Sequence, residues 1–132
     1  MLGAIPVPST VEATRGFLKE IEKRINQNHS ITIYPEAHIW PFYTGIRNFK
    51  SVSFKYPVKL DKPVYSITNT YQSYGRKNDK IKIISYIDGP FYPDKNLKIK
   101  EATEKLRNEV YEQMKERSKN SNIEYIKYEK AE

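Results

Sequence analysis

Apolar residues recur at helical spacing in two segments, one near each end of the chain. The first segment predicts a helix over residues 10–26, and Ser9 with Glu12 forms the capping-box pattern that starts many helices. The second predicts a helix over residues 100–119. The apolar stripe of the first consists of Val11, Thr14, Leu18, Ile21 and Ile25, with Phe17 beside it. One face of the second carries Ala102, Leu106, Val110, Tyr111 and Met114.

Three runs between these helices predict strands. The first, I-T-I at residues 31–33, is β-branched and stops at Pro35, because a proline cannot donate to a sheet ladder. The other two cover residues 64–71 and 81–87 and are separated by a polar loop at residues 73–80. If they pair through this loop, the pair is antiparallel.

Three further segments are ambiguous. In residues 49–60 the apolar positions alternate strictly from Val52 to Leu60, which favours a strand. Pro57 lies inside this run and favours an edge strand or a short irregular helix. Residues 88–90, D-G-P, are predicted to end the preceding strand as a turn. Residues 123–128 carry a weak pattern for a last short strand.

A helix followed by a strand is the unit that builds parallel sheets. The order helix 10–26, then strand 31–33, therefore predicts an α/β fold with a partial, mostly parallel sheet and flanking helices. At 132 residues the chain is expected to be a single domain, or part of one, over residues 1–132.

Composition excludes several kinds of site. The chain has no cysteine, which excludes disulfide, thiol and Cys-based metal chemistry and fits a reducing compartment. Its two histidines, His29 and His38, have no neighbours at metal-ligand spacing, and its five glycines are too scattered for a phosphate loop. No signal-peptide pattern and no membrane span of ~20 residues is found, so we expect a cytoplasmic protein. Because the sequence shows no metal or phosphate-loop motif, we also expect no cofactor.

The net charge of +7 favours anionic partners, such as nucleic acid, anionic lipid or a phosphate-bearing substrate. Because the acidic and basic residues are interspersed, plain solubility explains the charge equally well. The aromatic residues, 11 Tyr and 5 Phe, carry much of the apolar content and are interleaved with Lys and Arg.

The segment after the first predicted strand is the strongest candidate for a site. Glu36 follows residues 31–33 directly, and ligands of open α/β sheets bind at the carboxyl ends of strands. The alternative is a solvated turn with Glu36 exposed. Aromatic and basic residues come next, namely His38, Trp40, Phe42, Tyr43, Arg47, Phe49 and Lys50.

The order of these segments resembles the second half of the 1-acylglycerol-3-phosphate acyltransferase family. That family has four blocks: H-x-x-x-x-D, then G-x-I-x-x-x-R, then F-P-E-G-T-R with a following P-F-K, then a V-P-V-type strand. Here residues 3–5 (G-A-I) resemble the second block and residues 33–36 (I-Y-P-E) the third. Residues 47–50 (R-N-F-K) resemble its continuation, and residues 62–67 (K-P-V-Y-S-I) the fourth block. The likeness covers nearly the whole chain.

The chain departs from the family pattern at three places. Ser9 stands at the arginine position of the second block, and residues 37–39 (A-H-I) replace G-T-R in the third. The H-x-x-x-x-D block is absent, since Tyr34 follows His29 and Tyr43 follows His38 at the aspartate position. In the family that histidine is the general base and the aspartate orients it. The chain is therefore expected to be a truncated form, a gene fragment or a degenerate homologue.

The resemblance implies the acceptor-binding part of a glycerophospholipid acyltransferase, inactive alone. The intact enzyme would transfer an acyl group from an acyl-CoA or acyl carrier protein thioester to a lysophospholipid or glycerophosphate acceptor. Glu36 would help to form the acceptor site. Arg47 and Lys50 are candidates for binding the phosphate in place of the missing arginines, and Arg15 is a weaker one. For Arg47 and Lys50 the alternative is a solvated basic loop.

Two further expectations concern partners. Trp40, Phe42 and Tyr43 either pack into the core or contact lipid, which would make the protein peripheral on the inner face of the membrane. The competing function is a non-catalytic, Tyr-rich basic module for RNA or an anionic membrane surface, although no RNP block supports nucleic acid. A partial sheet would leave an edge bare, which predicts self-association through that edge or pairing with the missing half of the domain.

Overall fold

The computed structural model describes residues 10–130. The chain consists of two compact units, residues 1–34 and 35–132. The first unit contains helix α1, Val11–Asn26, which confirms the first predicted helix. Its N-cap is Thr10, whose hydroxyl accepts a hydrogen bond from the Ala13 amide at 3.1 Å. Ser9 of the predicted capping box lies outside the described residues.

The predicted strand at residues 31–33 is wrong. These residues form no ladder with any described part of the chain and belong to no helix or strand. A strand is defined by its backbone hydrogen bonds to a neighbour. The β-branched run supplies the side-chain preference for a strand, but no partner strand accompanies it.

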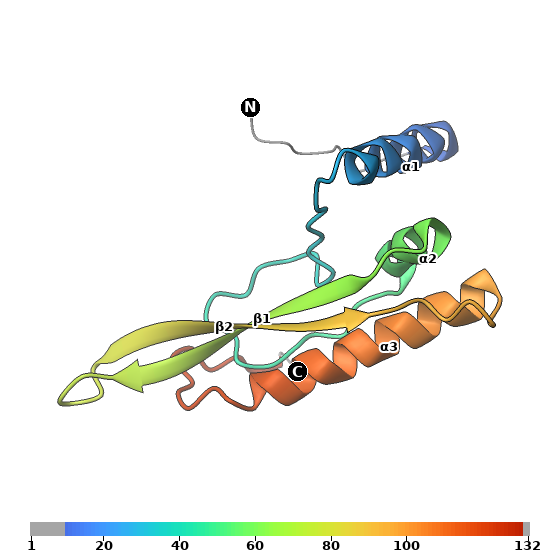
Figure 1. The fold of residues 1–132 in the computed structure, drawn as a ribbon. Coiled ribbons are helices and arrows are strands. Elements are labelled where there is room, and N and C mark those ends of the chain that lie inside the picture. Colours follow the sequence, from blue (N-terminus) through green and yellow to red (C-terminus); the bar gives the residue numbers. More distant parts are fainter. Residues whose placement is uncertain (1–9, 131–132) are drawn as a thin grey trace. The chain divides into compact units, whose positions relative to one another are not determined.

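The second unit is built on one long hairpin (Figure 1). Strand β1, Val64–Tyr74, pairs antiparallel with β2, Lys80–Phe91, in register from Ser66 opposite Asp88 to Tyr74 opposite Lys80. This two-stranded antiparallel sheet is the only sheet in residues 10–130, so the expected mostly parallel sheet is wrong. The helix-to-strand argument for a parallel sheet failed because its strand, residues 31–33, does not form.

The predicted pairing through the polar loop is confirmed, but the predicted end of the second strand is wrong. Strand β2 continues through Asp88 and Gly89 to Phe91, with a cis bond between Gly89 and Pro90 and a register shift opposite residues 64–66. Gly89 has φ 130°, and a Cβ there would lie 2.9 Å from the Val64 carbonyl oxygen. Only glycine therefore fits this approach of the two strands.

Residues 49–60 resolve in favour of the helical alternative. A 3₁₀ turn, Val52–Phe54, leads directly into the short helix α2, Lys55–Leu60. Pro57 lies in the first turn of α2, where a backbone N–H would have no intrahelical partner. Asp61 ends the helix with a left-handed conformation, φ 50°.

Helix α3, Ile99–Ser118, confirms the second predicted helix and lies along the hairpin (Figure 1). The core that it forms consists of Phe49, Phe54, Leu106, Val110 and Met114. Val64 and Phe91 of the hairpin pack against this core, which places α3 over one face of the sheet. On that face β1 carries small buried side chains, Ser66, Thr68 and Thr70, which let the helix approach closely. No helix within residues 10–130 is long and apolar enough to span a membrane.

Residues 119–130 form no strand, so the weak prediction at residues 123–128 is wrong. The segment nevertheless binds the outer edge of β1 near Tyr71. The amide of Asn122 donates to the Tyr71 carbonyl at 3.0 Å, and the Tyr71 amide donates to the Ser121 hydroxyl at 3.1 Å. The Ser73 amide donates to the Asn122 side chain at 2.8 Å. The bonds are partly to side chains, which explains why no regular ladder results.

Candidate functional site

The structure brings Glu36 and Arg47 together, eleven residues apart in the chain. The Arg47 amide donates to Glu36 Oε2 at 2.8 Å, and Arg47 Nε lies 3.6 Å from the same oxygen. Arg47 Nη2 donates to the Glu36 carbonyl oxygen at 2.8 Å and also to the His38 carbonyl oxygen. Both side chains are largely buried, with 18% of Arg47 and 28% of Glu36 exposed. Arg47 therefore holds the turn at residues 36–38 closed.

The turn itself is strained. The His38 amide donates to the Glu36 carbonyl at 2.8 Å, so the hydrogen bond spans only three residues. Ala37, at the centre, has φ 64°, in the left-handed region that favours glycine. A three-residue turn with positive φ at its centre is rare, so the contacts of Arg47 are what maintain it.

An aromatic cluster lies beside this turn and consists of Trp40, Phe42, Tyr43, Tyr71, Tyr125 and Tyr128. The Arg47 guanidinium lies 4.7 Å from the centroid of the Trp40 ring, and Tyr128 stacks on that ring at 5.1 Å. The Tyr128 hydroxyl donates to the Pro41 carbonyl at 2.8 Å. These rings pack on one another, which favours the packing interpretation of Trp40, Phe42 and Tyr43.

Burial raises the pKa of the Tyr71 phenol in this cluster, and the nearby Glu36 carboxylate adds to the effect because it opposes a second negative charge. The Tyr71 phenol therefore ionises at a higher pH than a free tyrosine.

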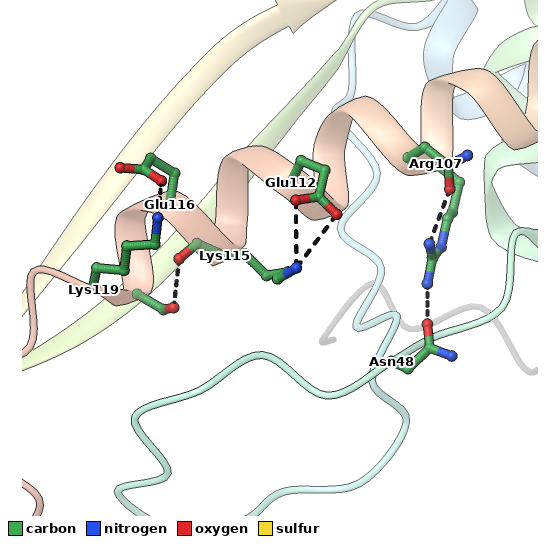
Figure 2. Close-up of polar contacts among 8 residues, drawn as sticks. Asn48, Arg107, Glu112, Lys115, Glu116 and Lys119 are labelled. Carbon is green, nitrogen blue, oxygen red and sulfur yellow. Dashed lines mark hydrogen bonds and ion pairs between the residues drawn. The ribbon is translucent and has the colours of Figure 1, made fainter.

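Lys50 is placed differently from Glu36 and Arg47. It is exposed, and no ion pair or hydrogen bond joins its ammonium group to any other described residue. The backbone before it is fixed by α3, because Arg107 donates to the Phe49 carbonyl from Nε at 3.0 Å and from Nη2 at 2.8 Å. Arg107 also donates to the Asn48 side chain (Figure 2). The exposed ion pairs of α3 in the same view, Glu112 with Lys115 and Glu116 with Lys119, contribute little.

The three predicted residues therefore take different roles. Arg47 is occupied by the Glu36 carboxylate and two carbonyls, so it is a positioning residue in this structure. Glu36 keeps one oxygen, Oε1, with no partner among residues 10–130. Lys50 offers the free cation. Arg15 lies in the other unit, on α1.

The rest of the described chain offers little in the way of a site. An open depression of about 470 Å³ is lined by Thr44, Gly45, Ser118, Lys119, Ser121, Asn122, Ile123 and Glu124, and none of the predicted site residues lines it. Within residues 10–130 no group of three or more His, Asp or Glu side chains could hold a metal ion.

Sequence reasoning missed the contribution of Tyr71, Tyr125 and Tyr128 to this region. Tyr71 lies in the first strand of the hairpin and Tyr125 and Tyr128 lie near the end of the chain, and nothing in the sequence around them indicates that they meet residues 40–43. A scan against protein-family models, a search of curated proteins and a search of solved structures each found no match to this chain.

Proposed function

We propose that this chain is the acceptor-binding part of a glycerophospholipid acyltransferase and that it does not turn over alone. In such an enzyme the histidine of the H-x-x-x-x-D block is the general base, and this sequence lacks that block. What the chain supplies is a carboxylate and a cation for an acceptor that carries a hydroxyl and a phosphate.

The observation that carries the proposal is the backbone at Ala37. The chain resembles the block F-P-E-G-T-R at residues 34–39, and Ala37 stands at the position of its glycine. The φ of 64° at Ala37 is the conformation that a glycine adopts without strain. The local backbone thus supports the same turn as the resembled block, although the residue differs.

The charges around the turn support the same function. The third block of the resembled family has an arginine where this chain has Ile39. Arg47 brings a guanidinium to this turn from eleven residues further on, through its bonds to the Glu36 and His38 carbonyls. Glu36 Oε1 can accept a hydrogen bond from an acceptor hydroxyl, and Lys50 can bind the phosphate as a point charge.

The test is the binding of sn-glycerol 3-phosphate and of lysophosphatidate to the ¹⁵N-labelled chain, followed by amide shifts. We expect binding at the amides of residues 36–50 and about tenfold weaker binding for Lys50→Ala, since one charged hydrogen bond is lost. Lys77→Ala is the matched control, because Lys77 is exposed in the loop between β1 and β2 and has no ion-pair partner among the described residues.

Two results would contradict the proposal. The first is no binding of either compound, or equal loss in Lys50→Ala and Lys77→Ala, which would leave only a general effect of charge. The second concerns turnover: acyl transfer by the chain alone, from an acyl thioester to lysophosphatidate, would show that the base is present after all. Inorganic phosphate that binds as well as sn-glycerol 3-phosphate would reduce the site to an anion site.

A second candidate, binding to an anionic membrane surface, is favoured by Ile39. This side chain is 91% exposed beside Trp40, which is 42% exposed, on a chain of net charge +7. Apolar and aromatic side chains enter the headgroup region while basic residues attract anionic lipid. We expect co-sedimentation with phosphatidylglycerol vesicles that Ile39→Ser weakens, and no binding to phosphatidylcholine alone. Equal binding of Ile39→Ser and the natural chain would refute it.

The RNA form of this alternative has less support. Bases stack on open aromatic faces, whereas the rings of the aromatic cluster are occupied by one another and by Arg47. Binding of a single-stranded oligonucleotide that falls steeply with salt would restore the RNA hypothesis.

A further inference from the structure

The hairpin has two outer edges, and the structure covers one of them in part. Tyr71 exchanges backbone and side-chain hydrogen bonds with Ser121 and Asn122, so the backbone groups of Tyr71 point away from β2. Since these groups alternate along a strand, Asn69 and Ile67 point the same way. This is the outer edge of β1, and residues 121–122 protect its end near the loop.

The outer edge of β2 follows from the register. Residues directly opposite each other in an antiparallel pair face the same way, toward the partner or away from it. Ile83 lies opposite Tyr71, so Ile83 faces outward, and with it Ile81, Ser85 and Ile87. Within the second unit, no segment of residues 35–130 outside β1 donates to or accepts from the backbone of β2. An unpaired strand edge of this length is a template for another strand.

The sheet face at this edge also lacks charge. Opposite α3 the hairpin presents Tyr65, Ile67, Asn69, Tyr71 and Ser73 from β1 and Ile81, Ile83, Ser85 and Ile87 from β2. Several are exposed: 56% of Ile67, 56% of Ile83 and 69% of Ile87. Asn69 and Ser85, in the middle, bond to each other at 2.6 Å. Two copies that meet here bring no like-charged side chains of this face together.

We propose that two copies of the chain pair through β2, antiparallel about a twofold axis at Ile84, to form a four-stranded sheet. In this register Ile81 lies opposite Ile87 of the second copy, and Lys80 lies opposite Asp88. The two lysines of β2, Lys80 and Lys82, never face each other. Pairing ends before the Gly89–Pro90 bond, where the lack of an N–H on proline would interrupt a ladder.

Charge selects this register among the possible ones. A ladder forms only if outward-facing residues of one copy lie opposite outward-facing residues of the other. Because these residues are two apart along β2, the twofold axis of the dimer always passes through a residue. An axis at Ile81 or Lys82 would set lysines opposite lysines, and an axis at Ile83 would set Lys82 diagonally beside its own copy. An axis beyond Ile84 would bring Pro90 into the ladder. An axis at Ile84 instead keeps the lysines apart. Lys82 then lies opposite Tyr86, and Lys80 lies opposite Asp88, whose carboxylate already binds the Arg117 guanidinium at 2.7 Å.

The first test uses proline at the outer edges. Ser85→Pro removes an outward N–H of β2 and leaves the bonds to β1 intact, as tolerated on edge strands. Asn69→Pro is the matched control, since Asn69 lies opposite Ser85, faces the other edge and loses the same side-chain bond. Light scattering across a dilution series should give twice 15.6 kDa for the natural chain and for Asn69→Pro at high concentration, and 15.6 kDa throughout for Ser85→Pro.

The second test remains decisive even if a proline variant fails to fold. Residues that face each other across an antiparallel pair without hydrogen bonds have Cα atoms ~4.5 Å apart, within disulfide range. Ile84→Cys should therefore form a disulfide-linked dimer when diamide oxidises the two thiols, in a chain that has no other cysteine. Lys82→Cys should not, because its copy lies roughly 13 Å away, four residues along the strand.

Three results would overturn the proposal. They are a natural chain that is monomeric at every concentration, a dimer that Asn69→Pro abolishes as well as Ser85→Pro, and equal disulfide formation in Ile84→Cys and Lys82→Cys. The second of these would mean that the exposed face or the edge of β1 mediates association. None of them bears on acceptor binding at Lys50, so the two proposals fail separately.

Discussion

Arg107 is the residue through which α3 holds the candidate site, and its replacement by methionine is the most informative perturbation. Its guanidinium donates twice to the Phe49 carbonyl and once to the Asn48 side chain. It also lies 5.0 Å from the Phe49 ring centroid and 4.3 Å from that of Tyr111. Methionine keeps the length and apolar stem of the side chain and removes the donors and the charge.

The magnitude follows from these contacts. Removing a charged donor from a half-buried carbonyl costs about 1.5–3 kcal/mol, and a cation–π contact at a partly exposed site contributes about 0.5–1 kcal/mol. We expect Arg107→Met to lower the free energy of unfolding by about 2–4 kcal/mol. At roughly 3–5 °C per kcal/mol for a domain of this size, Tm should fall by about 10 °C.

The assay is urea and thermal unfolding followed by circular dichroism, with Arg76→Met as the control. Arg76 lies exposed in the loop between the strands and has no ion-pair partner among the described residues, so its loss should change the free energy of unfolding by less than about 0.5 kcal/mol. The backbone at residues 48–50 should also loosen, which amide hydrogen exchange would detect. Equal stability of Arg107→Met and Arg76→Met would refute the argument that α3 fixes this loop.

Three further changes test other parts of the fold by the same unfolding measurements. Ala37→Gly should stabilise by about 0.5–1 kcal/mol, because glycine relieves the positive φ at slightly greater loss of chain entropy; destabilisation would contradict the strained turn. Leu106→Ala should cost about 2–5 kcal/mol, since Leu106 is 1% exposed in the core; a smaller loss would mean a loosely packed core. The Arg117 guanidinium, bonded at 2.7 Å, holds the pKa of Asp88 below its usual range, so Asp88 stabilises the fold above pH ~4, and the gain disappears as pH falls through the lowered pKa. Asp88→Asn should therefore be less stable than the natural chain at pH 7, and this deficit should shrink as the pH falls through the lowered pKa of Asp88. A deficit that does not change with pH would show that the charge is not the cause.

Elements defined by local pattern were predictable from the sequence. Both long helices lie within a residue or two of their predicted bounds, because each has an apolar stripe and a defined end. The hairpin was predictable because β-rich runs flank a short polar loop with Gly75. Even so, β2 runs past the expected turn at residues 88–90, since Gly89 can accept a φ of 130° that other residues would not.

The candidate site was only partly predictable, because its contacts join distant residues. Glu36 and Arg47 were proposed for the same site from a resemblance, and the structure places them in contact. Nothing in their spacing indicates that Arg47 binds the turn and not a ligand. The stacking of Tyr128 on Trp40 joins residues 88 positions apart, and no local signal in the sequence predicts it.

The failure at residues 31–33 shows what a local pattern omits. Val64–Tyr74 and I-T-I have the same side-chain preferences for a strand, yet only the former becomes one. The difference is that β2 begins at Lys80, with only residues 75–79 between it and the end of β1 at Tyr74, and satisfies the backbone groups of β1. The entropy cost of closing so short a loop is small. Residues 31–33 have no β-rich segment joined to them by a short polar loop. A β-branched run therefore predicts a preference for extended backbone, and a strand can be inferred only when its partner can be named as well.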